Sequence, residues 1–106
     1  MEKEEQDVSS RFVRNMGCSA EELLRWLPVS FPGATLKVGR NLSSGWCKAV
    51  YPDGALGLQW RVLEPRQIAL LRIPQLEVEF TYTDLSPERR REVQEFFDRT
   101  THRGGG

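Results

Sequence analysis

LGLQWRVL (residues 56–63) and LEVEFTYT (residues 76–83) alternate apolar and polar side chains along most of their length. A period of two predicts β-strands that turn one face toward a core and the other toward solvent. A segment with helical features, residues 86–100, follows at once and can cover the apolar face. The stretch from Leu56 to Tyr82 therefore predicts an α+β fold, and no catalytic or cofactor motif accompanies it.

The chain has 106 residues, among which 15 basic and 15 acidic side chains balance. This length allows one domain with one core. We expect an acidic disordered tail over residues 1–9, a single α+β domain over residues 10–101 and a flexible glycine tail over residues 102–106. Two cysteines, no export signal and no apolar segment long enough to span a bilayer predict a cytoplasmic protein without membrane contact.

Two helices are predicted from the residues at their N-termini. Ser19 and Glu22 have the spacing of a capping box, which predicts that a helix begins at Ala20. Because proline disfavours helix in the residue before it, we expect Pro28, together with Pro32 and Gly33, to end this helix after about ten residues. Ser86 is the expected N-cap of the second helix. The helical repeat predicts four inward side chains on this second helix: Val93, Phe96, Phe97 and Thr100.

The first strands are short. RFVRNM (residues 11–16) suits an edge strand whose charged side chains discourage aggregation. ATLKVG (34–39) and GWCKAVY (45–51) are expected to pair as a hairpin. Asp-Gly at residues 53–54 predicts a turn with positive φ before a strand over residues 55–63.

The region after residue 63 is harder to interpret. Glu64-Pro65-Arg66 is expected to turn the chain into QIALLRI (67–73), which lacks alternation and is interpreted as a strand buried on both faces. Pro74-Gln75 is a poor tight turn, so that a bulge, a bend or a wider loop stays open there. The predicted sheet therefore has five or six strands.

The predicted order is strand, helix, four or five antiparallel strands, helix, with both helices on one face of a single sheet. This order resembles the β-α-β(4)-α arrangement of the TATA-box-binding-protein-like and helix-grip folds. The resemblance concerns element order only, and a fold does not by itself define a function.

Part of the chain also resembles a family of small uncharacterised bacterial proteins. The resemblance is carried by the pattern NxGCSxxELLxWLP (residues 15–28), by the segment Arg66 to Leu71 and by the RGGG end. It implies a single domain and brings no activity with it.

Trp46 is the best indication of a functional surface. It shares a strand face with Lys48, so it is exposed if the alternate residues of that strand point into the core. Exposed tryptophans often mark binding surfaces, and guanidinium groups beside them add polar contacts. We therefore expect a non-enzymatic binding or adaptor module, without a cofactor or a metal, that contacts a protein partner through Trp46, Lys48, Arg61 and Arg72.

Two other functions stay open. The RGGG end (residues 103–106) resembles the glycine tails of ubiquitin-like and sulfur-carrier proteins, whose terminal carboxylate is activated. Basic residues are concentrated between residues 34 and 74, where Trp46 and Trp60 could stack on bases. Nucleic-acid binding is nevertheless less favoured, because the outer sheet face is expected to place Glu77 and Glu79 beside Arg61.

Overall fold

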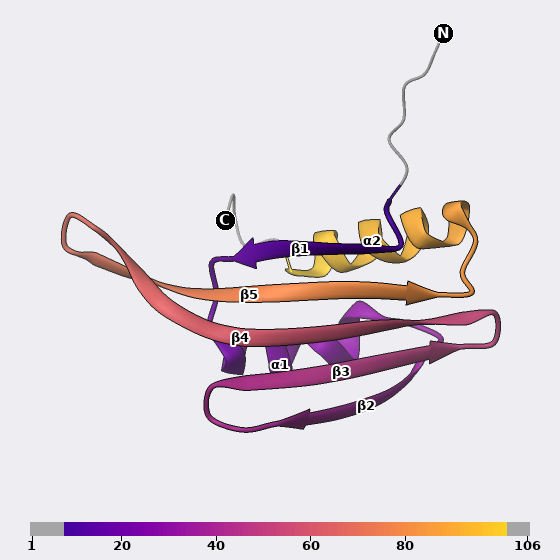
Figure 1. Cartoon of the computed structure of the whole chain (residues 1–106), viewed down its shortest axis with the longest axis horizontal. Coiled ribbons are helices and arrows are strands. Elements are labelled where there is room, and N and C mark those ends of the chain that lie inside the picture. The colour runs from indigo at the N-terminus through magenta and orange to yellow at the C-terminus, as the bar shows by residue number, and fades with distance from the viewer. Residues whose placement is uncertain (1–7, 102–106) are drawn as a thin grey trace, which may run out of the picture.

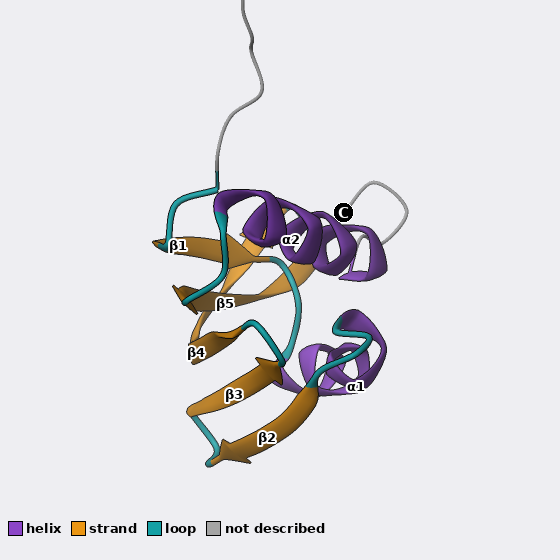
Figure 2. Ribbon diagram, turned by 90° about the vertical axis from the view of Figure 1, so that its right-hand side faces the viewer, coloured by secondary structure: helices purple, strands orange, loops and turns teal. Residues whose placement is uncertain are grey.

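The computed structural model describes residues 8–101 as an open antiparallel sheet of five strands with two helices. The elements in chain order are β1 (Arg11–Met16), α1 (Ala20–Ser30), β2 (Thr35–Arg40), β3 (Ser44–Tyr51), β4 (Gly54–Ile68), β5 (Leu71–Thr83) and α2 (Pro87–Thr101). The strands lie in the order β1-β5-β4-β3-β2, so β1 and β2 form the edges (Figure 1). Both helices cover the same face of the sheet (Figure 2). The α+β class is confirmed, whereas the likeness to TATA-box-binding-protein-like or helix-grip folds stays a prediction.

Most residues of the two predicted tails lie outside the part of the chain that the structure describes. Residues 1–7, most of the predicted acidic tail, lie outside it, and so do residues 102–106, which include the RGGG end. Val8 is partly buried, and its carbonyl oxygen accepts a hydrogen bond from Nε of Arg90 at 2.9 Å. The chain therefore contacts the domain from Val8 onward.

The start of α1 at Ala20 is confirmed, and its 11 residues agree with the expected length of about ten. The backbone N–H of Glu22 donates to Oγ of Ser19 at 3.1 Å, and the N–H of Ser19 donates to Oε1 of Glu22 at 3.0 Å, which completes the capping box. Pro28 itself lies inside α1, which continues to Ser30, and Pro32 and Gly33 follow the end of the helix as expected. Proline removes only one backbone hydrogen bond, and the hydroxyl of Ser30 supplies another by donating to the carbonyl of Trp26 at 2.7 Å.

The core lies between the helices and the inner face of the sheet. Aromatic rings fill its centre: Phe97 stacks on Phe31 with ring centroids 5.6 Å apart and meets Phe80 edge-on at 5.5 Å. Phe12 of the edge strand extends the cluster by stacking on Phe80 at 4.7 Å. The inner residues of the three middle strands join them: Cys47, Ala49, Tyr51, Leu56, Leu58, Trp60, Leu76, Val78 and Tyr82.

The buried face of α2 differs from the predicted one. Val93 and Phe97 are buried as expected, but Phe96 and Thr100 are partly exposed. Gln94 and Thr101 are buried in addition. The helix is therefore rotated so that polar side chains enter the interface, and hydrogen bonds make this rotation possible.

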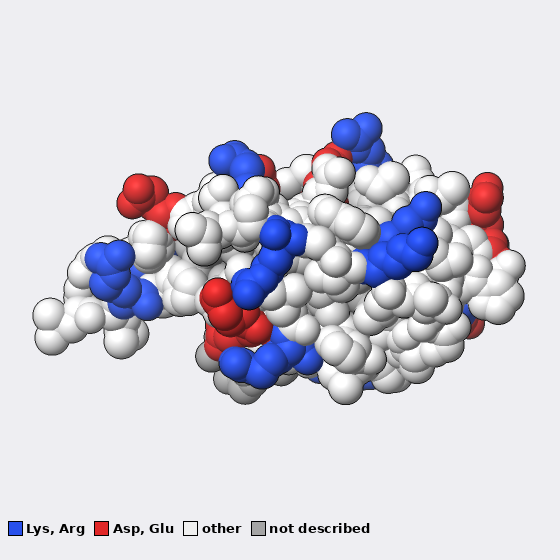
Figure 3. Space-filling model, turned by 90° about the horizontal axis from the view of Figure 1, so that it is seen from below, with Lys and Arg blue, Asp and Glu red and all other residues white. Residues whose placement is uncertain are grey.

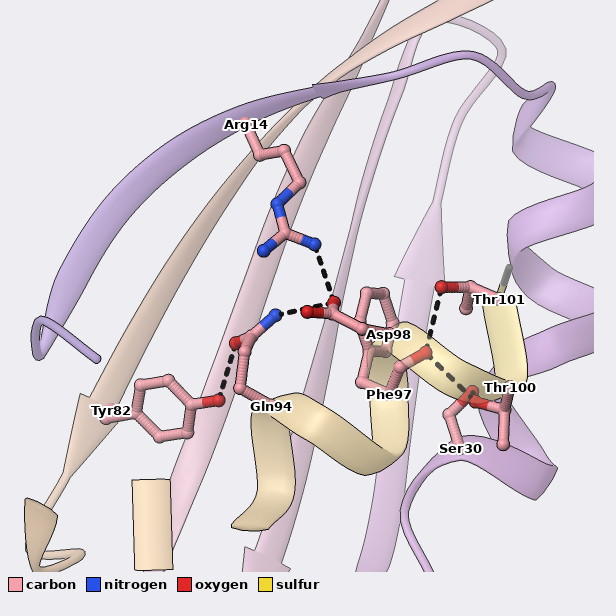
Figure 4. A network of polar contacts seen from close by, with 8 residues as sticks. All are labelled: Arg14, Ser30, Tyr82, Gln94, Phe97, Asp98, Thr100 and Thr101. Atoms are coloured by element: carbon pink, nitrogen blue, oxygen red, sulfur yellow. Dashed lines mark hydrogen bonds and ion pairs between the residues drawn. The ribbon is translucent and has the colours of Figure 1, made fainter. Parts of the chain in front are cut away.

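A chain of polar contacts links α2 to the sheet (Figure 4). The hydroxyl of Tyr82 donates to Oε1 of Gln94 at 2.7 Å, and Nε2 of Gln94 donates to Oδ1 of Asp98 at 3.1 Å. Asp98 also accepts a hydrogen bond from Arg14 of β1 at 2.6 Å. Gln94 is thus satisfied at both ends, which is what burial of an amide requires.

Strands β4 and β5 are longer than the sequence predicts. Residues 64–66 do not turn the chain but lie inside β4, where a register shift between Leu63 and Arg66 sets Glu64 and Pro65 opposite Pro74. Such a bulge accommodates proline, which has no N–H for the ladder. Of the possibilities left open at Pro74, the bulge is the one observed.

The interpretation of residues 67–73 as a buried strand is wrong. This segment forms the end of a β4–β5 hairpin that projects beyond the rest of the sheet, at the left of Figure 1. We call residues 63–74 the arm. Because the arm is a hairpin extension and no additional strand, the sheet has five strands.

The backbone conformation of the turn between β3 and β4 also differs from the predicted one. Gly54 pairs with Tyr51 across a turn formed by Pro52 and Asp53. Among the described residues, positive φ occurs at Gly33, Ala69 and Asp84, so the predicted positive φ at Gly54 is wrong. Glycine is required there by space, because a Cβ would lie 2.5 Å from the carbonyl oxygen of Thr83.

We expect the fold to lose stability in alkali. Burial raises the pKa of the Cys47 thiol to about 11, and burial is also the main cause that raises the pKa of Tyr82. The unfolded chain releases both protons at lower pH than the folded chain, so the free energy of unfolding should fall by about 1–3 kcal/mol as the pH rises from about 9 to 11. Urea unfolding at several pH values measures this loss. Cys47→Ala should reduce it, and stability that stays constant over this range would contradict the prediction.

Candidate binding surface

The outer face of the sheet, turned away from both helices, carries the candidate site. Strand register places five residues in one row across it, from the β2 edge to the β1 edge: Gly39, Trp46, Gln59, Glu79 and Val13. Trp46 stands in this row with 44% of its surface exposed. Its predicted exposure is therefore confirmed.

A hollow of about 630 Å³ lies over this row, and we call it the outer groove. Its lining includes Val13, Trp46 and Gln59, together with charged residues of β4 and β5. Nε of Arg61 donates to Glu77 at 2.7 Å. Just beside the groove, Nε of Arg11 donates to Glu79 at 2.6 Å. The mixed charge expected for this face is thus present as cross-strand pairs.

The indole of Trp46 lies against the backbone of Gly39 on the neighbouring strand. A Cβ added at Gly39 would be 2.5 Å from Nε1 of Trp46. A glycine that faces an aromatic ring across a strand pair is covered by that ring. One side of the ring is therefore used for packing, and the exposed part is available to a ligand.

Two lysines lie beside Trp46 on the outer face. Lys37 of β2 and Lys48 of β3 are directly opposite each other and exposed, and neither forms an ion pair with any residue from 8 to 101. On the other side of Lys48 lies Gly57, where an added Cβ would meet nothing closer than 3.8 Å. Like charges in direct opposition destabilise a strand pair, so an anionic group bound here would stabilise it.

The structure brings together three of the four residues predicted to bind a partner. Trp46, Lys48 and Arg61 share the outer face, whereas Arg72 lies opposite Gln67 on the arm, beyond the bulge. Arg72 therefore lies too far along the arm to flank Trp46 with its guanidinium group, as the prediction required.

Lys37 was missed as a site residue. The alternation of ATLKVG, in which Leu36 and Val38 flank Lys37, gives the signal that could have placed it beside Trp46.

The groups at this surface that can make non-covalent contacts include the indole of Trp46 and the ammonium groups of Lys37 and Lys48. The guanidinium of Arg61 and the carboxylates of Glu77 and Glu79 are already paired. Within residues 8–101 there is no cluster of three or more side chains suited to hold a metal. Both cysteines, Cys18 and Cys47, are buried free thiols away from this face.

Comparison of the chain with protein-family models, with curated proteins and with solved structures found no match. The resemblance to a family of small bacterial proteins therefore stays an expectation. Among residues 8–101, neither helix is long and apolar enough to cross a bilayer.

Proposed function

We propose that this domain is a non-enzymatic binding or adaptor module that holds an acidic protein segment across the outer face of its sheet. The observation that carries the proposal is the pair of Lys37 and Lys48, which no acidic side chain among residues 8–101 neutralises, beside the half-exposed ring of Trp46. Aromatic anchors with flanking charge are typical of residues that dominate protein interfaces. The buried thiols of Cys18 and Cys47 fit a reducing, cytoplasmic setting for this role.

An extended peptide fits this surface better than a nucleic acid. Glu77 and Glu79 border the outer groove, and their carboxylates would repel a continuous phosphate backbone. A peptide can place its few charges selectively. It would set a carboxylate near the lysines and an uncharged side chain against Trp46.

The spacing of the site suggests a peptide pattern. Trp46 and Lys48 are two residues apart on one strand and point to the same face, so their positions differ by roughly 7 Å along β3. Side chains two apart in an extended peptide have the same spacing. A peptide running along β3 would therefore present an apolar or aromatic residue at one position and Asp or Glu two positions later.

The proposal is tested with synthetic extended peptides of the pattern Leu-x-Glu and with matched peptides in which Lys replaces Glu. We expect the acidic peptide to shift backbone amide resonances of β2, β3 and the middle of β4 in NMR titrations. Its affinity should fall as salt rises, because exposed charges are screened. The Lys-containing peptide should cause no such shifts.

Charge reversal at the two lysines supplies the matched variants. Lys37→Glu combined with Lys48→Glu should weaken binding of the acidic peptide at least about 10-fold. Arg25→Glu makes the same kind of charge change on an exposed site of α1 and should leave binding unchanged. Equal weakening by Arg25→Glu, or tighter binding of a single-stranded RNA oligonucleotide than of the acidic peptide, would contradict the proposed function.

A further inference from the structure

The arm ends in exposed aliphatic side chains. Leu70 is 97% exposed at the turn, and its neighbours Leu71 and Ile68 are 63% and 48% exposed. Figure 3 shows the arm projecting at the left of the molecule, with uncharged atoms at its end. Three large aliphatic side chains gathered at one projecting tip form an apolar patch of the kind that marks an interaction site.

A second apolar feature lies at the base of the same arm. It is a hollow of about 540 Å³ between the start of α1, the β2–β3 turn and the first residues of the arm, and we call it the base groove. Its lining is mostly apolar and includes Ala20, Leu42, Val62, Leu63, Pro65 and Leu76. Leu42 is fully exposed at its rim.

The charges at the two ends of the arm are opposite in sign. Arg66 and Arg72 lie toward the tip, directly behind the aliphatic side chains. Glu64 lies at the base, and Glu21 of α1 lines the base groove with its side chain 71% exposed. Arg40 also lines the base groove, and its Nη1 lies 3.6 Å from Oε2 of Glu21, so the acidic side chains Glu21 and Glu64 outnumber this one basic side chain at the base.

We propose that two copies of the chain associate through their arms, which lie antiparallel about a two-fold axis so that each tip occupies the base groove of the other copy. Antiparallel packing of two identical arms places each tip at the partner's base whatever the arm length. It also places the basic residues of each arm beside the acidic residues of the other. An interface related by two-fold symmetry needs this kind of self-complementarity.

The tip cannot fill the groove of its own molecule. The arm runs about six residues from Leu63 to Ala69, so the tip extends roughly 20 Å from the base. An arm tip that occupies the base groove must therefore belong to another chain. A second copy matches it in both apolar character and charge.

Sedimentation equilibrium across a concentration series tests the association. The full chain has a mass of 12.2 kDa, so we expect a species of about 24 kDa. Leu70→Asp combined with Leu71→Asp should raise the dimer dissociation constant more than about 100-fold, because the change acts twice in a symmetric interface. Both residues are exposed in the monomer, so the variant should keep a wild-type circular dichroism spectrum. Val29→Asp changes an aliphatic residue of α1 that is as exposed as Leu71 and should leave the dimer intact.

A charge swap tests the antiparallel arrangement. Arg66→Glu with Arg72→Glu should dissociate the dimer, and adding Glu21→Arg with Glu64→Arg should restore it.

A protein that stays monomeric at millimolar concentration would overturn the proposal, and so would a dimer that the tip variant leaves unchanged. Rapid disulfide formation between two Leu70→Cys tips would show a tip-to-tip contact, and co-sedimentation of the monomer with anionic phospholipid vesicles through its tip would show a lipid surface as the occupant. Either result would also overturn it.

Discussion

Replacing Phe97 with alanine should lower the free energy of unfolding by about 3–5 kcal/mol. Phe97 is fully buried, stacks on Phe31 of the segment after α1 and meets Phe80 of β5 edge-on. Its ring thus contacts both the end of α1 and the sheet. Small domains are stable by only about 5–15 kcal/mol, so this variant should have a strongly reduced urea midpoint.

Phe96→Ala is the matched control for this prediction. Phe96 is the neighbouring phenylalanine of α2, is partly exposed and lies under the guanidinium of Arg99, 5.5 Å from its ring centroid. Its truncation removes less buried surface, so we expect a loss of about 1 kcal/mol. Equal losses for the two variants would mean that the buried face of α2 is the predicted stripe and not the rotated one.

Helix starts and strand faces could be predicted, because they depend on residues that are close in sequence. Ser19 with Glu22 and Ser86 mark helix starts because a side-chain oxygen satisfies a free N–H within three residues of the cap. The alternation of residues 56–63 and 76–83 likewise predicted most of the buried side chains of β4 and β5, whereas Val62, also expected to point inward, is 44% exposed. In each case the decisive interaction is made between neighbours in sequence or follows from the pleat of a strand.

The features that were missed depend on partners distant in sequence. Gln94 looks like a solvent-facing residue until Tyr82 of β5 is placed beside it. The apolar run at residues 67–73 indicates burial, and hydrophobicity alone cannot tell whether a core or a second chain would provide it. In the single chain this run is exposed, because β4 and β5 extend beyond the residues that pair with β3 and β1.

The candidate site could likewise be predicted only where it depends on the local sequence pattern. Exposure of Trp46 followed from alternation within one strand. The neighbours of Trp46 depended on strand order and register, which alternation does not define. That is why Lys37 was missed and Arg72 was included.

Two glycines each lie opposite a tryptophan in this sheet. Substituting them separately distinguishes a tryptophan that packs in the core from one that is proposed to bind a ligand. Gly45 pairs with Trp60 on the inner face, and Gly39 pairs with Trp46 on the outer face. A Cβ at either glycine would overlap the indole opposite. Gly45→Ala should lower the free energy of unfolding by about 1–3 kcal/mol, because the Trp60 ring is buried and has no space into which to move.

Gly39→Ala should cost less than about 1 kcal/mol, because the half-exposed ring of Trp46 can rotate into solvent. The same rotation moves the indole off the floor of the outer groove, so affinity for the Leu-x-Glu peptide should fall while stability is largely kept. Urea unfolding of both variants and a peptide titration of Gly39→Ala measure these effects. If Gly39→Ala destabilised the protein as much as Gly45→Ala, Trp46 would be fixed by packing like Trp60, and its role as a binding residue would lose its support.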